Sequence, residues 1–315
     1  MSPSKTKNYA ASVHQRLLNY ARSRGQDFIF VLRMFAMERL LYRLSRSSYV
    51  DNFVLKGAML FNLWTEDFYR QTRDIDVLAS KSHTIDSLKA VFQDISQIPF
   101  IDDGLIYLSD TVNVHEIREE QQYGGLRVTL TTMLGAAKIN LQVDCGFGDV
   151  ITPDPVVIEF PTLLDLPAPQ LRTYPKETVV AEKFEAIVRL GMANSRMKDF
   201  YDLWVLACDF PFSGAVLTLA IQNTFDRRRT PLPTALPEAF QASFIQNPLK
   251  QSQWQAFVRK NRFVKVEKDF EKTIDLVRSF LWPTVNSIAK TKSFDMTWPA
   301  GGTWLDKKTQ PNTKL

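Results

Sequence analysis

The chain has 315 residues, of which 45% are hydrophobic, 12% aromatic and 23% charged. It is therefore long enough for two folded domains and too apolar to be disordered. A formal net charge of +5 favours an anionic partner such as nucleic acid, although many basic proteins bind none. Because there are only two cysteines and no secretory leader in residues 1–10, we expect no disulfides and a cytoplasmic location. The densest apolar stretch, residues 28–44, contains four charged side chains, which argues against a membrane span.

The first half of the chain predicts helices followed by a strand-turn-helix unit. Apolar side chains recur with helical spacing over residues 10–47, and Gly25 is expected to break this run in two. A strand at residues 53–55 then leads through Gly57 into a helix over residues 58–64. This order places backbone N–H groups where phosphates can bind.

Two aspartates follow in an extended segment that carries the strongest functional signal. Alternate side chains of a strand point to opposite faces, so Asp74 and Asp76 project together while Ile75 and Val77 face a core. Mg²⁺ is commonly shared between one or two carboxylates and substrate phosphates, so the pair suits a nucleoside triphosphate. Chance alone yields an Asp-x-Asp in a chain of this length, and capped turns or surface carboxylates are the alternative interpretation.

A predicted hairpin supplies a third candidate carboxylate. After a helix over residues 82–96, residues 127–133 and 138–145 alternate around a short turn and are expected to pair. The alternation puts Asp144 on a polar face, before two glycines that allow close backbone approach. Asp144 could equally bond the backbone of that following turn.

The second half predicts a linker and a helical domain. We place N-terminal helices at 1–50, a catalytic domain at 51–152, a proline-rich linker at 153–175, a helical domain at 176–285 and an irregular tail at 286–315. Lys183 could reach a triphosphate from its helix or extend into water. Asp199 and Asp202 lie three residues apart and hence on one helix face, where Asp199 could also be a simple cap.

Five segments in this order resemble the AbiEii/AbiGii-type nucleotidyltransferase toxins, a branch of the DNA polymerase β-like nucleotidyltransferase superfamily. The matching segments are 53–58 (FVLKGA), 72–76 (TRDID), 141–149 (LQVDCGFGD), 178–186 (TVVAEKFEA) and 196–203 (RMKDFYDL). The resemblance implies an α/β (α+β) fold, with a mixed sheet in the nucleotidyltransferase domain and a C-terminal helical domain. It departs from the superfamily at Gly57-Ala58, where Gly-Ser or Gly-Gly is usual, so a side-chain hydroxyl contact to phosphate is lost.

Site residues follow from the resemblance position by position. It implies that Asp74 and Asp76 hold two Mg²⁺ ions, and from the residues we expect Asp144 to join them and to help deprotonate the acceptor. The implied roles of the remaining residues are nucleotide binding by Lys56, Gly57, Ala58, Thr72 and Arg73, neutralisation of phosphate charge by Lys183, and completion of the pocket by Asp199 and Asp202.

The expected function is Mg²⁺-dependent transfer of a nucleoside monophosphate from a nucleoside triphosphate to an acceptor hydroxyl. Relatives of this kind typically act as the toxin of a type IV toxin-antitoxin or phage-defence pair, with a cognate antitoxin encoded nearby that need not touch the toxin. Some add nucleotides to the 3′ end of tRNA. The alternatives are modification of a protein hydroxyl and a catalytically silent nucleotide-binding or interaction module. We expect no membrane partner.

Overall fold

The computed structural model describes residues 8–64, 72–81, 83–117, 124–261 and 265–306. The chain forms two compact units, each described by itself below. The first unit combines Met1–Gly148 with Val156–Thr173, and the second combines Asp149–Pro155 with Tyr174–Leu315. The chain therefore passes from one unit to the other more than once.

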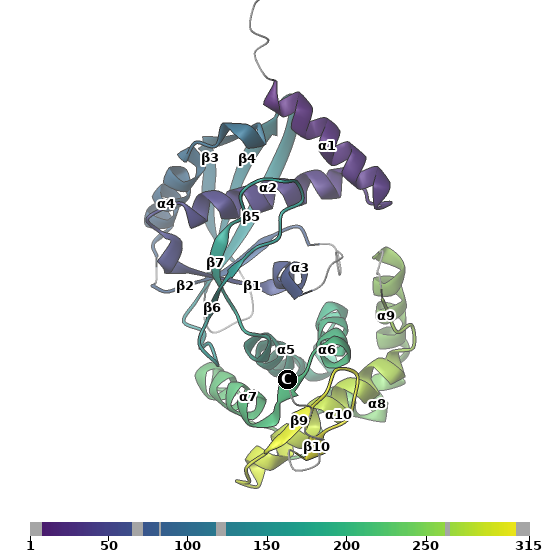
Figure 1. Ribbon diagram of the computed structural model, residues 1–315. Helices are drawn as coiled ribbons and strands as arrows, with labels where there is room; N and C mark the ends of the chain where they lie inside the picture. The colour runs from purple at the N-terminus through teal and green to yellow at the C-terminus, as the bar shows by residue number, and fades with distance from the viewer. Residues whose placement is uncertain (1–7, 65–71, 82, 118–123, 262–264, 307–315) are drawn as a thin grey trace, which may run out of the picture. The chain divides into compact units, whose positions relative to one another are not determined.

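The first unit is built on a seven-stranded mixed sheet with the strand order β3-β4-β5-β2-β1-β7-β6 (Figure 1). Its strands are β1 (Phe53–Lys56), β2 (Ile75–Ala79), β3 (Leu105–Ile117), β4 (Gly125–Leu134), β5 (Ala137–Phe147), β6 (Val156–Glu159) and β7 (Gln170–Thr173). Strands β4 and β5 form the expected hairpin, and β5 pairs with β2 in parallel. The expected mixed α/β fold class is confirmed.

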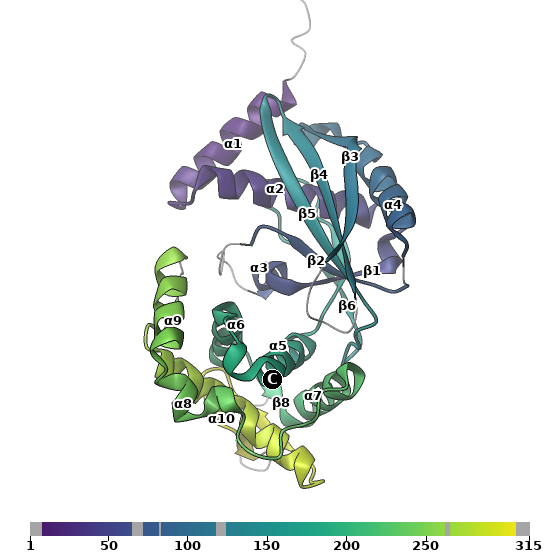
Figure 2. The same cartoon turned by 180° about the vertical axis from the view of Figure 1, so that it is seen from behind.

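Helices cover one face of the long strands. They are α1 (Tyr9–Ser23), α2 (Phe28–Ser45) and α4 (Ile85–Gln97). A short 3-10 helix, η2 (Gly57–Leu60), and a short α-helix, α3 (Phe61–Trp64), follow β1. Helix α2 passes in front of β3–β5 in Figure 1 and behind them in Figure 2. Leu130 and Leu141 pair across β4 and β5 and are 2% exposed, because alternate residues of both strands face this core.

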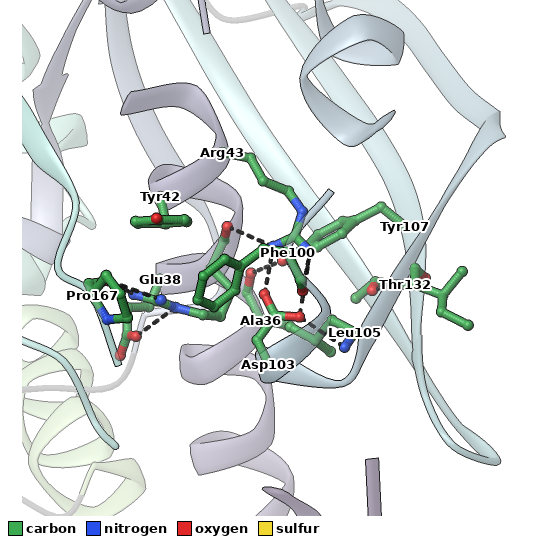
Figure 3. Close-up of polar contacts among 12 residues, drawn as sticks. Ala36, Glu38, Tyr42, Arg43, Phe100, Asp103, Leu105, Tyr107, Thr132 and Pro167 are labelled. Atoms are coloured by element: carbon green, nitrogen blue, oxygen red, sulfur yellow. Dashed lines mark hydrogen bonds and ion pairs between the residues drawn. The ribbon is translucent and has the colours of Figure 1, made fainter. Parts of the chain in front are cut away.

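Buried charges fix α2 to the sheet (Figure 3). The Arg43 guanidinium donates to both oxygens of Asp103 at 2.6 and 3.3 Å and lies over the Tyr107 ring, 4.5 Å from its centre. The Tyr107 hydroxyl donates to the Ala36 carbonyl on α2 at 2.6 Å. Burial of these groups is tolerated because each charge has a partner.

Most of the segment expected to be a linker, Val156–Thr173, belongs to the first unit instead. Within residues 153–175, β7 pairs in parallel with β1, and β6 pairs antiparallel with β7. Helix α2 holds their connection, because the Leu163 N–H donates to Glu38 at 2.7 Å and Arg39 donates to the Pro167 carbonyl at 2.9 Å. The proline-rich segment thus contains two strands of the sheet, whereas the sequence pattern alone predicted a linker.

The second unit is mainly helical. Its elements are α5 (Lys176–Leu190), α6 (Met197–Asp209), β8 (Phe212–Ser213), α7 (Gly214–Arg228), α8 (Ala242–Ile245), α9 (Pro248–Lys260), α10 (Phe270–Ala289), β9 (Met296–Trp298) and β10 (Leu305–Asp306). The expected irregular tail contains β9 and β10, which form a small sheet with β8. Trp298 is fully buried there, and its indole N–H donates to the Ala207 carbonyl at 2.7 Å. In the part of the chain that the structure describes, no helix is long and apolar enough to span a membrane.

Candidate active site

Charged side chains form a row across the sheet of the first unit. Strand register places Lys56 on β1 opposite Asp76 on β2, Asp76 opposite Asp144 on β5, and Asp144 opposite Arg127 on β4. Directly opposed residues of neighbouring strands share a face, so the four side chains lie on the face away from Ile75 and Val143. Two carboxylates are thus flanked by a cation on either side.

Gly57, which directly follows β1, makes room for the side chain of Asp76 on β2. Gly57 has φ +76°, a left-handed conformation that glycine adopts without strain. A Cβ atom added there would lie 2.6 Å from Asp76 Cγ and 2.7 Å from Asp76 Cβ, and closer still to Oδ2. The Asp76 carboxylate therefore occupies the space that any other residue at position 57 would fill.

Asp74 precedes β2 and is oriented by its neighbour Thr72. The Thr72 hydroxyl donates to Asp74 Oδ1 at 2.9 Å, and Thr72 is 6% exposed. Arg73, between them, is exposed. Asp74 lies in a bend directly before β2, so the face that it shares with Asp76 remains a prediction. Ala58 follows Gly57 into the buried turn and is 8% exposed.

Asp144 is held by an arginine that the sequence analysis did not single out. Arg127 Nε donates to Asp144 Oδ1 and Arg127 Nη2 to Oδ2, both at 2.8 Å, and Gln142 Nε2 lies 3.2 and 3.3 Å from the same oxygens. This paired geometry fixes the carboxylate plane firmly. Two strands of the hairpin thus hold Asp144 in place.

The chemistry of this donor set fits Mg²⁺ bound together with a triphosphate. Asp74 and Asp76 offer hard carboxylate oxygens, and one or two carboxylates suffice where substrate phosphates complete the ion's coordination. Among the described residues, no group of three or more His, Cys, Asp and Glu side chains could hold a metal ion by itself. The third expected ligand, Asp144, has its oxygens engaged by Arg127. Its metal role remains a prediction, which would require the carboxylate to share or exchange that partner.

Lys183, Asp199 and Asp202 form a separate ionic cluster in the second unit. Lys183 Nζ on α5 lies 3.0 Å from Asp199 Oδ1 and 2.7 Å from Asp202 Oδ2 on α6. Both aspartates are fully buried, and Arg196 Nε donates to the other Asp199 oxygen at 2.7 Å. Burial pushes the pKa of Asp199 upward, but Lys183 and then Arg196 outweigh it and lower that pKa. Two negative and two positive charges thus balance, and Asp199 does more than cap its helix.

A further cluster in the second unit is centred on Arg228. This guanidinium lies 3.1 Å from Asp149, 3.3 Å from Glu182 and 2.9 Å from Glu185. Its burial lowers the pKa of Arg228, but the three carboxylates outweigh that effect and raise it. Because Asp149 lies at the point where the chain enters this unit, the cluster anchors the crossing segment.

The expected site residues thus fall into two groups. The structure brings Lys56, Gly57, Asp76 and Asp144 together on one sheet, with Asp74 at the start of β2. The second group, on α5 and α6, is held in the other unit. Arg127 could have been found from the sequence, because counting back from the hairpin turn at Leu134 and Ala137 puts it opposite Asp144.

Comparison with known proteins gives one family match and two similar structures. The model of a family described as "Nucleotidyl transferase AbiEii toxin, Type IV TA system" matches residues 39–276. The crystal structure of JHP933 from Helicobacter pylori is 15% identical, with a TM-score of 0.43, and the match covers 90% of this chain and 95% of that chain. That of a proposed nucleotidyltransferase from H. pylori is also 15% identical, with a TM-score of 0.44 and coverage of 91% and 100%. No curated protein matches the chain.

Proposed function

The chain belongs to the AbiEii family of nucleotidyl transferase toxins, and we propose that it transfers a nucleoside monophosphate to a hydroxyl of an RNA acceptor in an Mg²⁺-dependent reaction. Membership of the family makes it a nucleotidyltransferase of the type IV toxin-antitoxin class. The metal, the acceptor and the roles of individual residues are the proposal. The 3′ end of tRNA is the acceptor that we propose.

One observation carries this proposal, namely the placement of Asp76. Its carboxylate lies against a left-handed glycine on one side and opposite the Arg127-bound Asp144 on the other. Strong positioning of carboxylates against backbone is characteristic of sites where binding geometry decides the rate. A surface carboxylate that served only solubility would need neither constraint.

The metal would be held by Asp74 and Asp76. When bound, Mg²⁺ supplies Lewis-acid stabilisation of charge on the attacking and leaving oxygens. The side chains of this chain do the positioning. Thr72 orients Asp74, and Gly57 leaves room for the Asp76 carboxylate.

In the transfer itself, the acceptor oxygen forms a bond to the α-phosphorus while the bond from that phosphorus to the pyrophosphate oxygen breaks. The acceptor hydroxyl loses its proton, and Asp144 is the residue that we assign to accept it. Arg127 keeps the Asp144 carboxylate in a fixed plane for this step. The Cys145 thiol behind this face is fully buried, and burial, then Asp144 and Asp76, raises its pKa.

Lys183 is assigned to the departing pyrophosphate, whose developing negative charge a lysine ammonium would offset. Asp199 and Asp202 hold this ammonium from two sides.

The test is label transfer from each α-³²P-labelled nucleoside triphosphate in turn, with Mg²⁺ and total bacterial RNA. Asp76→Asn removes one charge at nearly constant volume, and Asp86→Asn, at an exposed position on α4, is the matched control. We expect label in the tRNA band for the wild type and for Asp86→Asn, with at least a roughly 100-fold loss for Asp76→Asn.

Other outcomes overturn the proposal in distinguishable ways. Label that enters protein and spares RNA would identify a protein hydroxyl as the acceptor. No label with any triphosphate would support a silent nucleotide-binding module. Transfer that persists in Asp76→Asn would remove Asp76 from the site.

A further inference from the structure

A cavity of about 460 Å³ lies in the first unit beside the charged row, within the size range of small-molecule sites. Its polar lining comes from α2, from the residue before Asp74, from β3 and from the hairpin. The polar residues that matter below are Arg33, Arg73, Thr129, Thr131, Asn140 and Gln142. None of these six residues is assigned to the metal or to the pyrophosphate. Arg73 alone among them is expected from the sequence to bind the nucleotide.

The cavity continues the polar face of the hairpin away from Asp144. Register pairs Thr129 with Gln142 and Thr131 with Asn140, on the same face as the pair of Arg127 and Asp144. Gln142 joins the two regions, because it lines the cavity and its amide nitrogen lies within hydrogen-bond distance of Asp144. A ligand in the cavity would therefore end close to the Asp144 carboxylate.

The lining has the chemistry of a site for anionic, hydroxyl-rich ligands. Within the part of the chain that the structure describes, Arg33 and Arg73 form no hydrogen bond or ion pair with protein groups. Two unpaired guanidinium groups facing one cavity favour phosphate, which arginine binds with two parallel hydrogen bonds. Threonine hydroxyls and side-chain amides can both donate to and accept from ribose hydroxyls.

Strand order decides which substrate lies here. Asp76 on β2 separates the Gly57 side, on β1, from the Asp144 side, on β5. If the triphosphate lies toward Gly57, as the proposed function holds, the attacking hydroxyl must come from the opposite side. Most of the residues that line the cavity lie on that opposite side, on β4 and β5.

We propose that this cavity binds the ribose-phosphate backbone next to the 3′ end of the acceptor RNA, with Arg33 and Arg73 contacting phosphates. The assignment rests on the proposed function, because that function supplies the direction of the triphosphate. It adds Arg33, a residue of α2 far from the aspartates in sequence, to the substrate-binding surface.

The test measures binding of a fluorescein-labelled single-stranded RNA by anisotropy, without triphosphate, for Arg33→Gln and Arg16→Gln. Arg16 is an exposed residue of α1, so both variants lose one positive charge from the same unit. We expect Arg33→Gln to weaken binding about tenfold, as for loss of a hydrogen bond to a charged group. The plot of log affinity against log salt concentration should become less steep, by about 0.7 in slope. Arg16→Gln should change neither quantity beyond a small long-range effect.

Kinetics separate the two proposals. In the label-transfer assay, Arg33→Gln should raise the KM for RNA and leave kcat and the KM for the triphosphate unchanged. Equal RNA binding by both variants would overturn the cavity assignment while leaving wild-type transfer intact, and a raised triphosphate KM would assign the cavity to the nucleotide instead. Absence of any transfer by the wild type would overturn the proposed function, and the anisotropy comparison would still decide whether the cavity binds RNA. An unchanged melting temperature of Arg33→Gln shows that the variant is folded.

Discussion

Substitution of Gly57 by alanine tests the placement of Asp76 most directly. The added Cβ would lie 2.6 Å from Asp76 Cγ, whereas ordinary contacts of such atoms begin at 3.4 Å. The carboxylate must therefore retreat by roughly 1 Å, a displacement for which a catalytic group can lose about 100-fold in rate. In addition, a non-glycine residue in the left-handed region costs about 1–2 kcal/mol.

Gly25 provides the matched control. It has φ +60°, and a Cβ added there meets no atom within 4 Å. Gly25→Ala thus imposes the same kind of backbone strain without moving a carboxylate. We expect Gly25→Ala to lose on the order of 1–2 kcal/mol in thermal unfolding, and Gly57→Ala to lose more, because Asp76 must also shift.

Only Gly57→Ala should lose transfer activity, measured as kcat/KM with labelled triphosphate and RNA. If Gly57→Ala kept the activity of Gly25→Ala, the close approach of glycine and carboxylate would have no role in catalysis. If Gly25→Ala lost as much activity, strain alone would account for the effect. Either result would refute the reasoning about Asp76.

Three further predictions concern ion-paired side chains. Lys183→Met leaves Asp199 and Asp202 buried without their shared cation. The free energy of unfolding of the second unit, measured in urea, should therefore fall by about 3–5 kcal/mol. A fall within about 1 kcal/mol would show that the aspartates find other partners. Arg127→Gln should lower kcat by about 10–100-fold through loss of Asp144 orientation, and an unchanged kcat would contradict that positioning role. Burial raises the pKa of Glu38 to about 7, against the pull of Arg39. Between pH 4.5, the ordinary pKa of a glutamate, and about pH 7, the folded protein therefore binds more protons than the unfolded chain. The stability of the first unit should fall with rising pH in that window, by about 3 kcal/mol in all, and then level off. Glu38→Gln should remove this slope in unfolding measured from pH 4.5 to 8, and a persistent slope would assign it to other groups.

The local sequence pattern predicts much of the fold and of the candidate site. Period-two alternation and a short turn were enough for the β4–β5 hairpin, and side-chain alternation placed Asp144 on the polar face because register leaves only one choice. The aspartate pair was visible for the same reason. These features depend on neighbours in sequence.

Pairing between strands or side chains that are far apart in the sequence could not be predicted from it. Strands β6 and β7 are four residues each, and prolines surround them, so no local signal distinguishes them from a spacer. Their place is decided by β1 and by buried side chains of α2 more than a hundred residues earlier. Lys183 meets Asp202 through packing of two helices, which sequence spacing does not encode.

The late return of β6 and β7 to the sheet has a consequence for how the toxin becomes active during synthesis. Until Thr173 has left the ribosome, β1 lacks its partner β7, and the edge beside Gly57 and Lys56 stays open. An unpaired edge strand is a template for aggregation. A gene cut short between the codons for Asp144 and Thr173 would yield a polypeptide with all three aspartates and no finished sheet to hold them. Premature termination is thus a simple genetic route to a harmless product, and fragments that end at Thr152 should be insoluble rather than partly toxic.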